Sequence, residues 1–174
     1  TQATKDLAGN AVPAAFSSFD AARNSLDGIF FTHPNAAQGM LGGFVDQIIG
    51  TALLLFCIRA ITDTRNSSPI GNLAPFIIGL LVVVIGQSFG AAAGYAINPA
   101  RDFGPRLLAA VGGWGANPFT DDNGYFWVPI VAPIIGGIIG IFVYDYGIKS
   151  YLIARGNQPL LDEESKGETV RETK

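Results

Sequence analysis

The sequence predicts an all-α membrane protein with three transmembrane helices and one shorter, re-entrant half-helix. Three observations lead to this fold class: three long apolar stretches, a charge-poor middle, and a short helix that begins at an Asn-Pro pair. Of the 174 residues, 49% are hydrophobic and 14% are charged, whereas soluble domains carry roughly 25% charged residues. Only ten charged residues lie between residues 40 and 148. This distribution argues against a soluble enzyme and against a disordered chain.

The three apolar stretches define the expected organisation, because a spanning helix needs about 20 mostly apolar residues. The expected spans are residues 40–61, 72–90 and 127–148. They divide the chain into an outer loop or amino-terminal segment, a transmembrane part and a disordered cytoplasmic tail, which are residues 1–39, 40–148 and 149–174.

Basic residues near the spans predict the orientation of the chain. Arg59 and Arg65 flank the end of the first span, and Lys149 and Arg155 follow the third. Because positive residues favour the cytoplasm, the first and third spans are expected to run inward. The protein is then multi-pass, with its carboxyl terminus in the cytoplasm.

Glycines recur every four residues in two of the spans. Gly86, Gly90 and Gly94 form one series, and Gly136 and Gly140 form the other. In a membrane this spacing allows helix backbones to approach closely. The alternative is that membrane helices are simply rich in glycine.

A shorter helix is expected over residues 98–111. Asn98 is a good N-cap and Pro99 suits the first helical position, since it has no amide hydrogen to leave unpaired. Gly112 and Gly113 end the apolar pattern. At 1.5 Å per residue the helix is roughly 20 Å long, which is too short to cross a bilayer of about 30 Å.

An apolar loop followed by a half-helix indicates a re-entrant segment. Irregular backbone at membrane depth is tolerated where it lines a water-filled cavity, so its carbonyl groups would face passing solutes. The helix amino terminus carries partial positive charge, Asn98 adds an amide donor, and Arg101 adds a full charge. The alternative is an ordinary surface helix on which Arg101 and Asp102 are solvated.

The string GYAINPARDFGPR resembles the second Asn-Pro-Ala signature of the major intrinsic proteins, the aquaporins and aquaglyceroporins. The resemblance runs from about residue 28 to residue 148 and implies the second repeat of the aquaporin-like fold. Asp102, directly after the arginine, is similar to the glycerol-conducting branch.

The resemblance also implies roles for individual residues. The pore signature is Asn98, Pro99 and Ala100. The selectivity constriction is Arg101, Tyr95 and Gly86, where water-selective members have histidine at the position of Gly86. Asp46 resembles the buried acidic residue that braces the signature loop, although that residue is usually glutamate.

The function implied by the resemblance is a passive channel in the cell membrane for glycerol, small neutral polyols and water. The family has six spans in two repeats, and this chain resembles only the second repeat. Its expected partners are therefore the lipid bilayer and the first repeat of the same channel, which is expected to be missing by truncation. The family also implies a homotetramer. The alternative is a non-conducting half-channel that assembles with or regulates a full-length channel.

Other functional classes find little support in the composition. A single cysteine and a single histidine, His33, argue against a metal site. A net charge of −3 gives no basic surface for nucleic acid. No nucleophile stands with a base, so the sequence predicts neither an enzyme nor a cofactor.

Overall fold

The computed structural model describes residues 28–154 and 156, and the regular secondary structure in them is helical, without strands. The α-helices are α2 (Gly39–Thr62), α3 (Ala74–Ala93), α4 (Pro99–Ala109), α5 (Asn117–Gly124), α6 (Val128–Val143) and α7 (Ser150–Ala154). Three stretches are long and apolar enough to cross a membrane: Gly39–Thr62, Ala74–Ala93 and Asn117–Ala154. The predicted fold class is confirmed.

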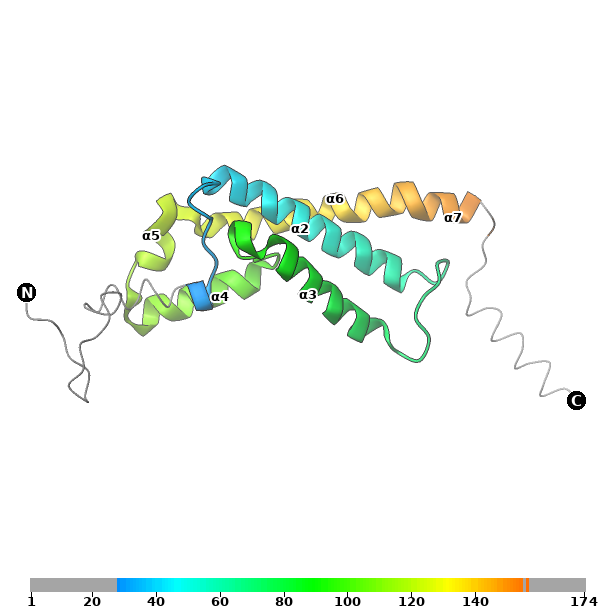
Figure 1. The fold of residues 1–174 in the computed structure, drawn as a ribbon, viewed down its shortest axis with the longest axis horizontal. Helices are drawn as coiled ribbons and strands as arrows, with labels where there is room; N and C mark the ends of the chain where they lie inside the picture. The colour runs from blue at the N-terminus through cyan, green and yellow to red at the C-terminus, as the bar shows by residue number, and fades with distance from the viewer. Residues whose placement is uncertain (1–27, 155, 157–174) are drawn as a thin grey trace, which may run out of the picture.

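The helices are arranged around two pairs (Figure 1). Helices α2 and α6 run side by side, and α3 and α4 lie below them, end to end. The amino-terminal end of α4 meets the carboxyl-terminal end of α3 near the middle of the molecule. With 11 residues, α4 is about 16 Å long, so it reaches only part of the way across a bilayer.

Helices α2 and α6 pack with their backbones in contact. A Cβ atom added at Gly136 would lie 2.3 Å from the carbonyl oxygen of Ile48, and one added at Gly140 would lie 2.1 Å from that of Ala52. No side chain fits at either position. We call this contact, formed by Ile48, Ala52, Gly136 and Gly140, the seam. It confirms the close approach that the second glycine series predicts.

The ends of the third apolar stretch differ from the expected 127–148. Residues Asp121, Asp122 and Asn123 leave helical geometry inside α5, so the continuous rod begins after this break. At the other end the helical path continues through a π-helical turn (Tyr144–Lys149) into α7. Residues 149–154 are therefore helical, where a disordered tail was expected. The remainder of that tail lies outside the described residues, as does the expected outer segment before residue 28.

The second expected span, 72–90, also shifts. Helix α3 has a proline in its first turn, Pro75, and it continues to Ala93. It ends at Gly94, whose φ of +72° is the left-handed conformation typical of a glycine after a helix. The apolar run AAA lengthens the helix because alanine is the best helix former.

Polar contacts tie α2 to the third stretch at the end opposite α5. Arg59 donates to Asp145 at 2.7 Å, and the Tyr144 hydroxyl donates to Asp63 at 3.1 Å. Burial raises the pKa of Asp63, but hydrogen bonds from the Arg65 amide and from Tyr144, together with the charge of Arg65, outweigh it. The pKa of Asp63 is therefore lowered.

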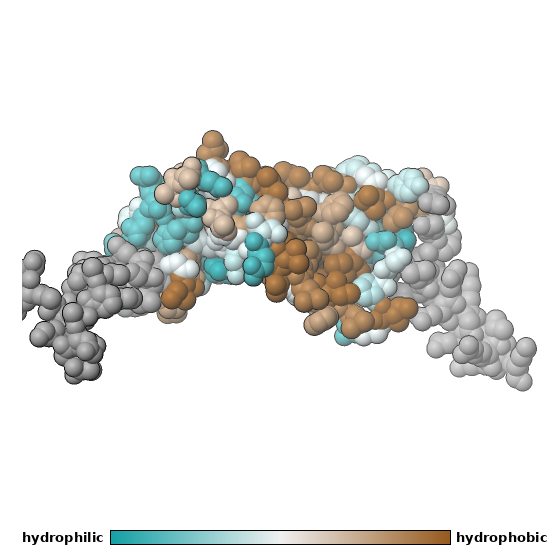
Figure 2. Space-filling view, viewed as in Figure 1, coloured by the Kyte–Doolittle hydropathy of each residue, from teal (hydrophilic) through white to brown (hydrophobic). Residues whose placement is uncertain are grey.

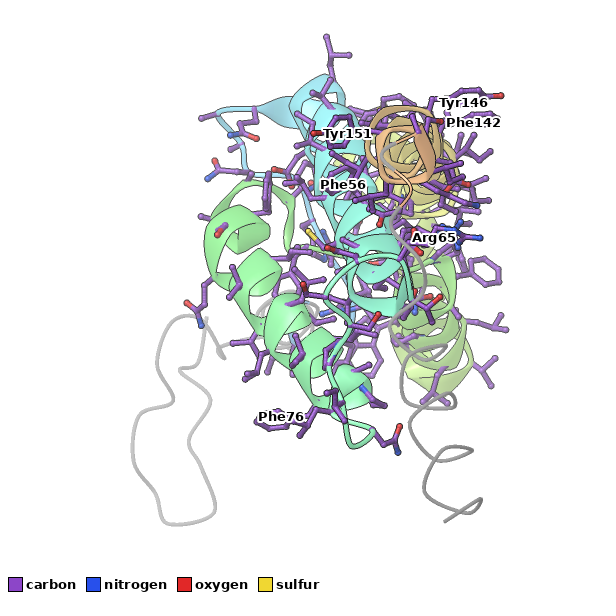
Figure 3. The ribbon with its side chains drawn as sticks, turned by 90° about the vertical axis from the view of Figure 1, so that its right-hand side faces the viewer. Phe56, Arg65, Phe76, Phe142, Tyr146 and Tyr151 are labelled. Carbon is purple, nitrogen blue, oxygen red and sulfur yellow. The ribbon has the colours of Figure 1, made fainter. Side chains whose placement is uncertain are left out.

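The outer surface is largely apolar. Hydrophobic residues form a band over the middle of the molecule, and hydrophilic residues gather near α5 (Figure 2). Phe76 and the stacked pair Phe142 and Tyr146 point away from the other helices (Figure 3). Their side chains are more than half exposed. A surface of this kind suits contact with lipid or with other transmembrane helices.

Candidate functional site

The site is built around the amino-terminal end of α4. Asn98 has extended backbone geometry, and its Oδ1 accepts hydrogen bonds from the amides of Ala100 at 3.0 Å and Arg101 at 3.4 Å. Pro99 occupies the first turn, as expected. Among the described residues, none accepts a hydrogen bond from Asn98 Nδ2. The amide group is therefore left as a donor.

The backbone before Asn98 is irregular. Gly94, Tyr95 and Ile97 have φ values of 72°, 41° and 42°, so two side-chain-bearing residues lie in the left-handed region. We call residues 94–98 the signature loop. In the described part of the chain, the carbonyl groups of residues 95–97 accept no hydrogen bond. Such backbone is stable in a membrane only where it lines a cavity or is buried in protein.

A buried amide on α2 holds the signature loop. Gln47 is fully buried. Its Nε2 donates to the carbonyl oxygen of Ala93 at 3.0 Å, and its Oε1 accepts from the amide of Ile97 at 2.8 Å. The side chain thus bridges the two ends of the irregular backbone. Gln47 alone therefore pairs the amide of Ile97 and the carbonyl group of Ala93, which the backbone of the loop leaves without backbone partners.

Tyr95, Gly86 and Arg101, which the sequence analysis expects to form a constriction, lie close to one another. The Tyr95 ring lies against α3, where a Cβ added at Gly86 would be 3.2 Å from two ring atoms. The guanidinium carbon of Arg101 lies over the same ring, 5.6 Å from its centroid. Arg101 itself is exposed, so its charge faces the space beside the loop.

That space is a groove of about 460 Å³. One side carries polar groups from the signature loop and from Arg101, and the other carries apolar side chains. The lining residues are Thr51, Leu54, Leu55, Val82, Tyr95, Ala96, Ile97, Asn98, Pro99, Arg101, Pro133 and Ile134. The groove is therefore amphipathic, with donors and acceptors along one wall.

Asp102 lies on the opposite side of α4, away from the groove lining. It is fully buried, accepts from the amide and hydroxyl of Thr32 at 2.7 Å each, and accepts from Arg106 Nε at 2.6 Å. Arg106 also donates to the carbonyl oxygens of Thr32 and Pro118. This buried network fixes α4 to the irregular segment before α2 and to α5.

A model of the family "Major intrinsic protein" matches residues 3–144. The chain belongs to the major intrinsic protein family. The match begins well before residue 28, where the resemblance found in the sequence began.

Several curated relatives are similar to this major intrinsic protein. Aquaporin-10 of Homo sapiens is 43% identical over 116 residues, which are 67% of this chain and 38% of that protein. The glycerol uptake facilitator protein of Escherichia coli strain K12 is 47% identical over 121 residues, or 68% of this chain and 43% of that protein. The chain thus spans about two fifths of the length of these relatives.

The fold is also similar to a solved structure. The aquaglyceroporin from Plasmodium falciparum superposes with a TM-score of 0.70 at 32% sequence identity. The similarity covers 78% of this chain and 56% of that one. The arrangement of spans and half-helix is therefore that of the major intrinsic proteins.

The brace of the signature loop differs from the sequence expectation. Asp46 was expected to hold the loop, but the structure gives the hydrogen bonds to Gln47. Adjacent residues on a helix point about 100° apart, so only one of the two can face the loop. Asp46 Oδ2 is buried and has no hydrogen-bond partner among the described residues.

A signal for Gln47 was present in the sequence of this major intrinsic protein. Gly43, Gln47, Gly50 and Thr51 are the buried residues of α2 and recur at helical spacing. Small and polar residues on one face of an apolar helix mark the side that contacts protein. Asp46 is three residues from Gly43 and four from Gly50, so the same spacing also admits Asp46, and only the packing of the helices decides between the two residues. The i,i+4 spacing of Asp102 and Arg106 likewise indicated an ion pair on α4.

His33 and Asp122 lie outside the groove and contact each other. His33 Nδ1 lies 2.5 Å from Asp122 Oδ2, at the non-helical break inside α5. The described residues contain no group of histidine, cysteine or acidic side chains arranged to hold a metal ion. His33 is therefore a loop residue with a carboxylate partner.

Proposed function

We propose that this chain forms the carboxyl-terminal half of a passive membrane pore for glycerol, small neutral polyols and water. The observation that carries the proposal is the amphipathic groove at the junction of α3, the signature loop and α4. We assign Asn98 Nδ2 and Arg101 as its donors, and as its acceptors the carbonyl groups of Tyr95 and Ile97, which accept no hydrogen bond within the described part of the chain.

A polyol suits this groove because it has two chemically distinct sides. Its hydroxyl groups both donate and accept, so they match donors and carbonyl groups spaced along one wall. Its carbon backbone matches the apolar wall, to which Leu54, Val82 and Ile134 contribute. The names of the relatives, among them a glycerol uptake facilitator, support this substrate class.

Cations are disfavoured by the charge at the same place. The amino-terminal end of α4 carries partial positive charge, and Arg101 adds a full charge whose guanidinium group lies over the Tyr95 ring. Both act in a groove with few competing polar groups. A neutral solute avoids this electrostatic cost.

The chain is proposed to lie in the cell membrane with a cytoplasmic carboxyl terminus. Arg59 and Lys149 both reach Asp145, at 2.7 and 3.9 Å, so the basic residues gather at one end of the bundle. Positive residues favour the cytoplasmic side. The first repeat of the family would supply the second wall of the pore, and the resemblance implies a homotetramer.

The test uses the chain alone and a completed channel. The completed channel is this chain joined to the part of the Escherichia coli glycerol uptake facilitator that the match leaves uncovered. Both are reconstituted in liposomes, and stopped-flow light scattering follows volume changes in glycerol and sucrose gradients. We expect the chain alone to match protein-free vesicles and the completed channel to pass both glycerol and water.

A matched pair of variants assigns the flux to this chain. Asn98→Leu removes the cap and the donor at the groove, so it should abolish the glycerol flux. Asn117→Leu changes the other Asn-Pro pair, which lies outside the groove, and should retain the flux. A completed channel that folds but passes no glycerol would contradict the proposal and favour a non-conducting half-channel.

A further inference from the structure

The Tyr95 ring rests on two glycines of α3, not on one. A Cβ atom added at Gly86 would lie 3.2 Å from ring atoms Cε2 and Cζ, and one added at Gly90 would lie 3.1 Å from Cδ1. The two glycines therefore meet opposite edges of the ring. We call Gly86 and Gly90 the glycine seat.

In the part of the chain that the structure describes, no second helix comes within 4 Å of a Cβ atom added at Gly90. Among the described residues, the atoms within 4 Å of an added Cβ, beyond its own helix backbone, are Cδ1 and Cε1 of Tyr95. This differs from Gly136 and Gly140, where the nearest atoms belong to the backbone of another helix. At position 90 the group that would crowd a side chain is therefore the Tyr95 ring.

The seat fixes where the ring can lie. Distances of 3.1 to 3.2 Å are shorter than ordinary van der Waals contact, so an alanine at either position would require the ring to shift by a few tenths of an ångström away from the helix. Because α3 blocks one side, the ring would move toward the groove that it lines and toward Arg101, which lies over it. The groove would narrow at the constriction.

We propose that Gly90 is a specificity-determining residue of this channel, which acts by setting the depth of the Tyr95 ring. The inference rests on the proposed function and extends it to a residue outside the groove lining. Gly90 touches no solute. It is a positioning residue, and its effect on the pore passes through Tyr95.

The first test compares two alanine variants of the completed channel. Gly90→Ala should lower the ratio of glycerol to water permeability by about tenfold, which is the lower end of the effect of one methylene group in a tight pocket. Gly79→Ala is the control, since it lies on the same helix and an added Cβ meets nothing within 4 Å. It should leave the ratio unchanged.

The second test asks whether the effect passes through the ring. In a Tyr95→Ala background the obstacle is gone, so adding Gly90→Ala should have no further effect on the ratio. A general loss of stability would persist in that background. If Gly90→Ala alone does not insert in membranes, the double variant should restore insertion, and failure to do so would overturn the inference.

The outcomes separate this inference from the proposed function. If the unsubstituted completed channel passes no glycerol, the proposed function fails. If it passes glycerol but Gly90→Ala behaves as Gly79→Ala does, only the role of Gly90 fails. A fall in the ratio that is equally large with and without the Tyr95 ring would also reject it.

Discussion

The seam and the glycine seat are built from the same sequence pattern but serve different ends. Gly136 and Gly140 are four residues apart, as are Gly86 and Gly90. At the seam each glycine faces a carbonyl oxygen of α2, within 2.3 Å of an added Cβ. At the seat each glycine faces a side-chain ring at more than 3.0 Å.

This difference shows that two glycines four residues apart indicate a close contact with the helix, but they do not indicate whether the contacting group is a backbone or a side chain. A backbone carbonyl cannot move without displacing its whole helix, whereas an aromatic ring can tilt. Substitutions at the seam should therefore destabilise the fold, and substitutions at the seat should change selectivity in a channel that still folds. The following changes test that division.

The largest effect is expected at the seam. Gly140→Ala places a methyl group 2.1 Å from the Ala52 carbonyl oxygen, so α2 and α6 must separate along their length. We expect a loss of about 3 kcal/mol or more in the free energy of unfolding, measured by denaturant titration in micelles.

The neighbouring glycine provides a matched control. An added Cβ at Gly137 would meet the Leu55 side chain at 3.6 Å, which is ordinary contact. Gly137→Ala should therefore fold with little change in stability. If both variants unfold alike, the backbone contact is not what holds the seam.

The brace of the signature loop should give the next largest effect. Gln47→Met keeps the volume but leaves the Ala93 carbonyl group and the Ile97 amide without their partner. We expect a loss of about 2 kcal/mol in the free energy of unfolding. Hydrogen exchange at the Ile97 amide should also accelerate, because its acceptor is gone.

Asp46→Asn is the companion change, and it distinguishes the two candidate braces. Asp46 Oδ2 has no partner in the described chain, so neutralising it should leave exchange at Ile97 as it is. If exchange at the Ile97 amide is faster in Asp46→Asn and unchanged in Gln47→Met, Asp46 and not Gln47 holds the signature loop.

A change at the seat should act on selectivity. Gly86→His places an imidazole group against the Tyr95 ring and beside the groove. The groove becomes narrower and its wall becomes polar, so the permeability to glycerol should fall more than the permeability to water. We expect the ratio of glycerol to water permeability to fall about tenfold or more, equivalent to roughly 1.4 kcal/mol of barrier.

Stopped-flow measurements on the completed channel give this ratio. Gly86→Ala provides a smaller change at the same position for comparison. The alanine adds only the Cβ, so its fall should be smaller and in the same direction. An unchanged ratio in both variants would mean that Gly86 does not border the constriction. The assignments of Tyr95 and Arg101 would weaken with it, since the three residues meet at one place.

The helices and the half-helix were predictable from the sequence because they depend on local signals. Apolar length marked the spans, and the Asn98-Pro99 pair marked the start of α4, which the capping hydrogen bonds of Asn98 bear out. Helix ends were less accessible. The continuation to Ala154 depends on a π-helical turn whose start no apolar pattern marks.

The partners of individual side chains were harder to predict, because they depend on how helices are rotated about their axes. A shift of one residue separates Asp46 from Gln47, and only packing decides between them. The contact between Gly90 and the Tyr95 ring could not be predicted for a similar reason. Tyr95 reaches back to α3 because its backbone adopts a φ of 41°, which its residue type does not favour.

The smallest effect is expected at the far end of the seam, where Asp63 ties the end of α2 to Tyr144. The pKa of Asp63 is lowered in the folded chain, because the hydrogen bonds and the charge of Arg65 outweigh the effect of burial. A carboxyl group with a lowered pKa stabilises the fold above its unfolded-state pKa of about 3.9. That contribution disappears as the pH falls through the folded-state pKa.

Melting of the chain in detergent tests this prediction. Between pH 6 and pH 3 the melting temperature should fall slightly more for the unsubstituted chain than for Asp63→Asn. Other carboxylates act equally in both chains, so only the difference reports on Asp63. Equal drops would mean that this contact closes the end of the seam without stabilising it, and the seam would then depend on its glycines alone.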